Sequence, residues 1–228
     1  MLGVLVNSVA IIIGSVIGIL CKKGIPEKIS QPIMKGIGLC VIYIGISGAL
    51  CGENTLILII STVLGVTVGT LLDLDGKFNR LGDALEKRYA KNGEQGVFSR
   101  GFVSASILFC VGAMAVVGSI NAGLGDHTIL YTKATLDGIS SVIFSASMGI
   151  GVMFSAIPIL IYQGLIALFA GALQGILTET AINEMSCVGY VLIMGLGFNL
   201  VGMTKLKVAD FMPAIIIAPI LAGIVALF

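Results

Sequence analysis

The sequence has no tryptophan, a single histidine and very few charges. Asp, Glu, Lys and Arg make up 11% of its 228 residues, whereas soluble domains carry about 25%. Hydrophobic residues make up 57%, and the mean hydropathy is +1.10. So few charges could not cover the surface of a soluble fold this apolar. The chain is therefore predicted to be an integral membrane protein, with the lipid bilayer as its first partner.

Motifs for metal binding and for hydrolysis are also missing. The five cysteines are scattered and form no CxxC pair, which argues against a zinc site and a disulfide framework. The one histidine, His127, falls in a loop, so no base is placed to activate a serine. A net charge of +1 offers no basic surface to nucleic acid. We expect no enzyme activity, no cofactor, no metal and no nucleic-acid partner.

Eight apolar segments follow one another along the chain. Their lengths fit helices that cross a hydrocarbon core of about 30 Å, and none alternates with the period of two that a membrane barrel requires. The segments are 2–21, 33–50, 55–72, 101–121, 134–154, 156–177, 186–203 and 210–228. The sequence therefore predicts an all-α membrane protein with about eight transmembrane helices in one membrane domain, 1–228.

Lysine and arginine fall almost entirely on one side of this arrangement. Of the 13 basic residues, only Lys133 lies in the loops of the other side. Basic loops stay in the cytoplasm, so both termini are predicted to lie outside a bacterial cytoplasmic (inner) membrane. The polar segment 73–100 would then be a cytoplasmic connector. Within it, Leu81, Leu85 and Tyr89 recur at four-residue spacing, which indicates an amphipathic helix on the inner leaflet.

The sequence resembles itself at an offset of 157 residues. The matching features are Gly14-x-x-x-Gly18 with Gly171-x-x-x-Gly175, Glu53 with Asp210, and, at an offset of 150, residues 41–50 with 191–200. The first and sixth segments cross in opposite directions in the predicted topology. Residues 1–72 and 156–228 are therefore predicted to form two inverted three-helix repeats, an architecture common in secondary transporters. The alternative is that the small-residue pairs are ordinary helix packing or a homodimer seam.

The central helix pair, within 101–155, is rich in glycine. Glycine costs a helix interior about 1 kcal/mol relative to alanine, so Gly112 and Gly149 are predicted to permit a break in the fourth and fifth segments. A helix end at membrane depth presents free backbone N–H or C=O groups to a small ion or polar solute. The alternative is that both helices are continuous and their glycines admit a neighbouring helix.

The fifth segment carries the polar residues of the predicted site. Asp137, Ser141 and Ser145 share one helix face at a spacing of four, and Ser140 lies beside them. An acidic residue inside a membrane helix is costly and indicates a functional site. Asp137 could bind a cation, carry a proton or pair with Lys133. Alternatively, it caps the start of its helix at the outer interface and needs no site.

Amide side chains at membrane depth complete the candidate set. Gln163 and Asn199 are predicted to line the site, and Asn7 lies at nearly the repeat-equivalent position of Gln163. Such side chains also hydrogen-bond neighbouring helices, for about 0.6–2 kcal/mol each, without binding a solute.

Four runs of sequence carry a resemblance to a known family: 36-GIGLCVIYIGISGAL-50, 107-ILFCVGAMAVVGSINAGLGDH-127, 133-KATLDGISSVIFSASMGIGVMFSAIPILIYQG-164 and 195-GLGFNLVG-202. The chain resembles the bacterial membrane family known as domain of unknown function 554, the YqgA-like proteins. The resemblance covers essentially the whole chain and implies a multi-spanning protein, but it transfers no activity. It implies that the residues typical of the family include Gly112, Ala113, Met114, Gly118, Asp137, Ser140, Ser141 and Gln163.

These observations predict a membrane transporter of a small solute or ion, with its site near the middle of the membrane. Because the sequence has no ATP-binding motif, coupling to H⁺ or Na⁺ is expected. One alternative is a passive ion channel assembled as a homo-oligomer. The other is a scaffold or sensor that transports nothing and acts through residues 73–100.

Overall fold

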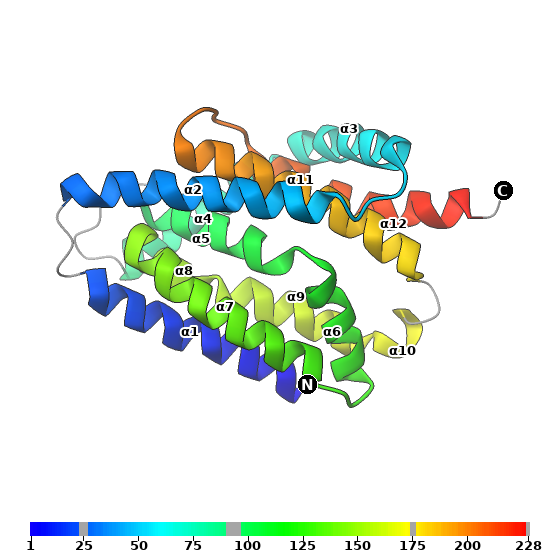
Figure 1. Ribbon diagram of the computed structural model, residues 1–228, viewed down its shortest axis with the longest axis horizontal. Coiled ribbons are helices and arrows are strands. Elements are labelled where there is room, and N and C mark those ends of the chain that lie inside the picture. The colour runs from blue at the N-terminus through cyan, green and yellow to red at the C-terminus, as the bar shows by residue number, and fades with distance from the viewer. Residues whose placement is uncertain (23–26, 90–96, 174–176, 227–228) are drawn as a thin grey trace. The chain divides into compact units, whose positions relative to one another are not determined.

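A computed structural model describes residues 1–22, 27–89, 97–173 and 177–226 (Figure 1). Every regular element in these ranges is a helix, which confirms the predicted all-α class for the described part of the chain. Five stretches are long and apolar enough to cross a membrane, and the number rises to seven if each of two bent helix pairs is one span. The prediction of eight spans is therefore not confirmed.

The helices within the described ranges follow the chain as α1 (Leu2–Lys22), α2 (Glu27–Ala49), α3 (Thr55–Leu71), α4 (Leu74–Tyr89), α5 (Val97–Cys110), α6 (Ala113–Gly123), α7 (Thr128–Met148), α8 (Gly151–Phe154), α9 (Ala156–Leu168), α10 (Ala170–Leu173), α11 (Glu179–Val201), the 3₁₀ helix η1 (Val208–Phe211) and α12 (Pro213–Val225). They form two compact units. The first comprises Met1–Met34, Lys77–Cys110 and Met114–Ala170, and the second comprises Lys35–Gly76, Val111–Ala113 and Gly171–Phe228.

Two helices begin well before their predicted starts because polar residues satisfy their first turns. Before α7, the carboxylate of Asp126 accepts hydrogen bonds from the backbone N–H of Thr128 at 2.9 Å and from its hydroxyl at 2.7 Å. These bonds hold the pKa of Asp126 below its usual range. Before α11, the hydroxyl of Thr178 accepts a hydrogen bond from the N–H of Ala181, and Glu179 lies in the first turn. Hydropathy alone assigned these turns to loops.

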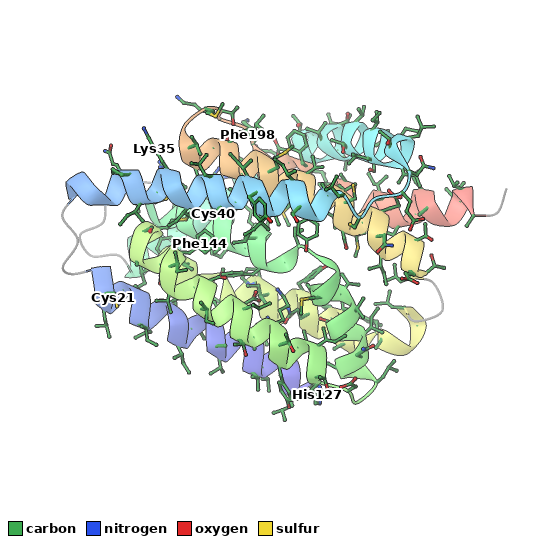
Figure 2. The ribbon with its side chains drawn as sticks, in the orientation of Figure 1. Cys21, Lys35, Cys40, His127, Phe144 and Phe198 are labelled. Atoms are coloured by element: carbon green, nitrogen blue, oxygen red, sulfur yellow. The ribbon has the colours of Figure 1, made fainter. Side chains whose placement is uncertain are left out.

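In the first unit, α1 and α7 lie side by side (Figure 1). Gly14 lies against the backbone of Gly138, and Gly18 lies against Ser145, so the contacts advance together and the helices run parallel. The glycines of the Gly14-x-x-x-Gly18 motif thus bring two backbones together, as small residues do between membrane helices. His127 lies at one end of this unit (Figure 2). A cluster of buried apolar side chains joins the four helices α1, α6, α7 and α9: Val4, Ala122, Leu130 and Ala167.

In the second unit, α3 packs antiparallel against α12. Gly65 lies against Ala214, and Gly69 lies against Asp210. The contacts move forward along α3 as they move backward toward η1, so the two segments run antiparallel. The helix α2 makes the same kind of contact with α11, because Gly45 lies against Met194 and Gly52 against Cys187. Two antiparallel pairs with close backbones therefore form this unit.

The helices end at both glycines that were predicted as break points. Between α5 and α6 the chain bends by 66°, and Gly112 has a φ of +104°. The helix α7 ends at Gly149, which has a φ of +76°. Residues with a side chain rarely adopt these angles, so glycine is required at both breaks.

The predicted amphipathic helix of the connector is present as α4, which is bent by 57° from α3. Leu81 is exposed on it, whereas the side chains of Leu85 and Tyr89 lie outside the described part of the structure.

Candidate functional site

A buried ion pair lies on α7 in the first unit. The ammonium of Lys133 is 3.0 Å from one carboxylate oxygen of Asp137 and 2.9 Å from the other. Each residue is only 6% exposed. Asp137 lies in the third turn of a helix that begins at Thr128, so the alternative that it caps the helix start is wrong. Asp137 is instead paired with Lys133, as the second reading predicted.

A pair of amide side chains adjoins the ion pair. The Asn7 amide on α1 donates to the Gln163 carbonyl on α9 at 3.1 Å, and both residues are completely buried. The Asn7 side chain also lies near the Asp137 carboxylate. Two atoms of this amide pair have no hydrogen-bond partner, namely the Asn7 carbonyl oxygen and the Gln163 nitrogen. The Asn7–Gln163 bond thus joins α1 to α9 and leaves one acceptor and one donor of the pair unused.

The predicted serines lie on the buried side of α7, with one exception. The Ser141 hydroxyl donates to the Asp137 carbonyl at 2.6 Å, and the Ser145 hydroxyl donates to the Ser141 carbonyl at 2.5 Å and to the Ser15 carbonyl of α1 at 3.0 Å. Ser140 is half-buried and stands beside this row. Ser141 and Ser145 therefore share the buried face of α7 with Asp137, and the bond from Ser145 to Ser15 also holds α7 and α1 together.

Two predicted site residues belong to the second unit instead. Asn199 fastens the turn after α11: its amide donates to the Leu206 carbonyl at 2.7 Å, and its oxygen accepts from the Thr204 hydroxyl and the Leu206 N–H, both at 2.8 Å. Gly112 lies against the Tyr190 hydroxyl. The structure does not bring either residue into the Asp137 group.

Sequence reasoning missed two groups, the half-buried thiol of Cys110 and the buried carboxylate of Glu184. Cys110, the last residue of α5, is close enough to Lys133 and Asp137 to interact electrostatically with both. In the second unit, Glu184 is completely buried, and its carboxylate accepts the N–H groups of Glu53 at 2.8 Å and Asn54 at 2.7 Å, at the start of α3. No local pattern marks either residue, because each role depends on a helix far away in sequence.

The chemistry of the first-unit group is that of two opposite charges held out of water. A buried carboxylate can take up a proton or a cation, and a buried ammonium can bind an anion. Among the described residues, no group of three His, Cys, Asp or Glu side chains lies together to hold a metal ion. The group is therefore suited to small ions or polar solutes.

The sequence model of a family described as "Protein of unknown function (DUF554)" matches residues 2–223. The chain belongs to this family. The resemblance found in the sequence is thereby confirmed, and family membership leaves the activity open.

Two relatives match along nearly their whole length. The chain is 30% identical over 233 residues to the "Uncharacterized membrane protein YdfK" of Bacillus subtilis (strain 168), covering 100% of this chain and 98% of that protein. It is 29% identical over 221 residues to the "Uncharacterized protein YqgA" of Escherichia coli (strain K12), covering 95% and 94%. No solved structure matches the chain. The membrane assignment of the sequence thus agrees with the description of a relative.

Proposed function

We propose that this protein is a secondary transporter of a small solute or ion, coupled to H⁺ or Na⁺, with its site at the Lys133–Asp137 pair. The observation that carries the proposal is the burial of both charges, each 6% exposed, beside two unpartnered amide atoms. In a hydrocarbon environment an ionisable side chain costs about 2.5–3.5 kcal/mol at the helix centre even on insertion scales. Ionisable side chains with this cost usually mark the path of a transported solute or ion, so the Lys133–Asp137 pair is expected to bind it.

A purely structural role explains the pair less well. Replacing a buried ion pair with apolar side chains of similar volume is often neutral or stabilising, by about 1–4 kcal/mol. On α1, α5, α6, α7 and α9, Asp137 is the one acidic side chain, and Lys133 is the basic residue that neutralises it one turn away. An ion pair that stability alone does not require supports a role in binding.

The packing of α3 and α12 supports the two inverted repeats that we propose for this transporter. Buried residues on the two helices correspond at the offset of 157: Ile57 with Ala214, Ser61 with Ala218, and Gly65 with Ala222. The two faces pack on each other antiparallel, as Gly65 against Ala214 shows. A pair of equivalent, antiparallel faces is what a local twofold axis between two inverted repeats would give.

The other repeat-equivalent helices support the same proposal. Asn7 and Gln163, which lie at nearly equivalent positions of α1 and α9, are hydrogen-bonded to each other. Gly45 lies against Met194, which is the neighbour of the residue equivalent to Gly45 at the offset of 150. In each pair, residues at or next to equivalent positions contact each other. Transporters built from inverted repeats bind solute where the repeats meet.

The helix breaks and the lipid-facing surface fit a transporter as well. Broken helices at membrane depth occur where backbone lines a cavity or is covered by protein. Gly112 and Gly149 interrupt consecutive segments of the central part of the chain. Beyond the face of α1 that packs on α7, exposed apolar side chains such as Leu5, Ile13 and Leu20 would face lipid.

The proposed orientation, with both termini outside an inner membrane, has its own test. Single cysteines would be introduced into a variant in which the five native cysteines are replaced. In cells, a membrane-impermeant maleimide should label the exposed positions 178–180, whereas positions 73–100 should be labelled only after permeabilisation. Labelling of 178–180 only from inside would contradict the inverted topology.

Transport itself is tested by flux into proteoliposomes. Monovalent cations, small anions and amino acids would be offered in turn, with currents and internal pH recorded. We expect a saturable flux in the parent protein, none in Asp137→Asn, and parental flux in the matched control Ser140→Ala. A flux that does not saturate would indicate a channel. No flux of any solute through folded protein would refute the proposal.

A further inference from the structure

We propose that the first-unit site takes up a proton on Asp137 together with a small monovalent anion on Lys133. The coupling ion would then be H⁺, and the transported solute a singly charged anion. This inference rests on the proposed transport function for its physiological role, while the binding chemistry stands on the site itself.

The first argument is charge conservation in a medium of low dielectric. The Lys133–Asp137 pair holds one positive and one negative group in contact, at 2.9 and 3.0 Å, and is neutral. A proton that binds Asp137 leaves the Lys133 ammonium buried without a counter-ion, which costs several kcal/mol. An anion on Lys133 restores neutrality. Proton and anion therefore favour each other's binding, as reciprocal linkage requires.

The second argument comes from the two unpartnered amide atoms. The Asn7 carbonyl oxygen lacks a donor, and the Gln163 nitrogen lacks an acceptor. Protonation gives Asp137 an O–H group, which is the donor that the Asn7 carbonyl oxygen needs. The anion supplies an acceptor for the Gln163 nitrogen. The loaded site thus satisfies two groups that are costly to leave buried and unpaired.

The binding step is simple in its balance. A proton from water adds to one carboxylate oxygen of Asp137, forming an O–H bond. The two contacts between the Lys133 ammonium and that carboxylate are exchanged for contacts with the anion, and Lys133 keeps its three protons. The remaining polar neighbours do not change charge: the amides of Asn7 and Gln163 are neutral. The thiol of Cys110 is the other titratable group that interacts electrostatically with Asp137.

Sodium fits the same place less well. Both oxygens of Asp137 already contact the Lys133 ammonium. The Ser141 and Ser145 hydroxyls already donate to backbone carbonyls, and the Asn7 oxygen is the oxygen of the amide pair that has no partner. A proton needs one oxygen, whereas a metal cation needs a shell of several. To bind a zwitterion between them, the charges of Lys133 and Asp137 would have to separate by the length of the zwitterion. The two residues lie one turn apart on the same helix, which opposes that separation.

The test measures protonation directly and does not require transport. Infrared difference spectra of the reconstituted protein would be recorded during a pH titration, with Asp137→Asn as the control that identifies the carboxylic-acid carbonyl band. The probes are chloride, nitrate and ¹³C-labelled acetate, whose own carbonyl band is displaced by the isotope. Sodium gluconate and choline gluconate hold the ionic strength constant.

We expect an Asp137 band that appears on acidification, and at least one probe anion should raise its midpoint by about one pH unit or more, a tenfold change. The anion effect should vanish in Lys133→Met. Absence of the band, or a midpoint insensitive to all three anions, would overturn the inference, as would a midpoint lowered by sodium relative to choline. Glycine would be offered as a zwitterionic probe in the same titration, and a midpoint moved by glycine but not by the anions would replace the inference with zwitterion binding. Flux without this linkage would support the proposed transport function and overturn the inference about proton and anion binding. Linkage without flux would support the binding inference and refute the transport function.

Discussion

Removal of one member of the buried ion pair should destabilise the protein far more than removal of both. Lys133 and Asp137 are each 6% exposed, and their charged atoms are 2.9 and 3.0 Å apart. Lys133→Met keeps the length of the side chain but leaves a buried carboxylate, and Asp137→Asn keeps the shape but leaves a buried ammonium. Breaking a buried pair in this way costs about 3–5 kcal/mol. The double variant contains no buried charge and should lie within about 1 kcal/mol of the parent.

The assay is reversible unfolding in mixed micelles, followed by circular dichroism, on all four proteins of the double-mutant cycle. The coupling energy between the two substitutions should be at least about 3 kcal/mol and favourable. Additive effects would refute the reasoning, because they would mean that the two side chains reach separate solvated positions. The double variant should also fold without transporting, which separates the binding role of the pair from its structural cost.

Three further predictions concern packing and capping, and the first two use the same unfolding assay. Gly18→Ala should lower the free energy of unfolding by about 1–3 kcal/mol through overpacking, since the added methyl group would collide with the Ser145 hydroxyl. In the matched control Gly171→Ala the methyl group enters open space, so the substitution should be neutral. Equal effects of the two would contradict the α1–α7 contact. Glu184→Ala should lower the free energy of unfolding by about 3 kcal/mol or more, because two hydrogen bonds to the start of α3 are lost. Glu184→Gln should lower it clearly less, because the amide oxygen still accepts those bonds. Equal costs would contradict the role of Glu184 in capping α3. The pKa of Asp126 is lowered in the folded state, so its stabilising effect is complete above its unfolded value of about 3.9 and fades as pH falls through the lower folded value. Asp126→Asn should flatten that acidic limb in a pH series, and an unchanged limb would contradict this assignment.

What the sequence could predict is what depends on neighbouring residues along one helix. Hydropathy indicated apolar helices, and glycine in otherwise helical stretches indicated the breaks at Gly112 and Gly149. The four-residue spacing of Asp137, Ser141 and Ser145 placed them on one face, and in the structure all three are buried.

What the sequence could not predict depends on polar groups that another part of the chain satisfies. The early start of α7 depends on Asp126, which hydropathy assigned to a loop together with the first turns of the helix. Asn199 carries the same amide as Gln163, but a turn seven residues away uses all of it. Only the tertiary structure distinguishes an amide that fastens its own loop from one with an unused atom beside a buried charge.

Asn7 connects the fold to the proposed function more directly than Asp137 does. It lies on α1, donates to Gln163 on α9, and reaches the carboxylate on α7. Any movement of α1 against α9 must stretch or break the Asn7–Gln163 bond. Because the Asn7 side chain also lies near the Asp137 carboxylate, that movement changes the surroundings of Asp137 as well. We expect Asn7→Leu to weaken the coupling between protonation of Asp137 and the relative position of α1 and α9. The infrared band should remain, and its dependence on anions should become smaller without vanishing, because Lys133 still carries the charge that binds the anion. Retention of the full anion dependence in Asn7→Leu would show that the amide plays no part in the coupling.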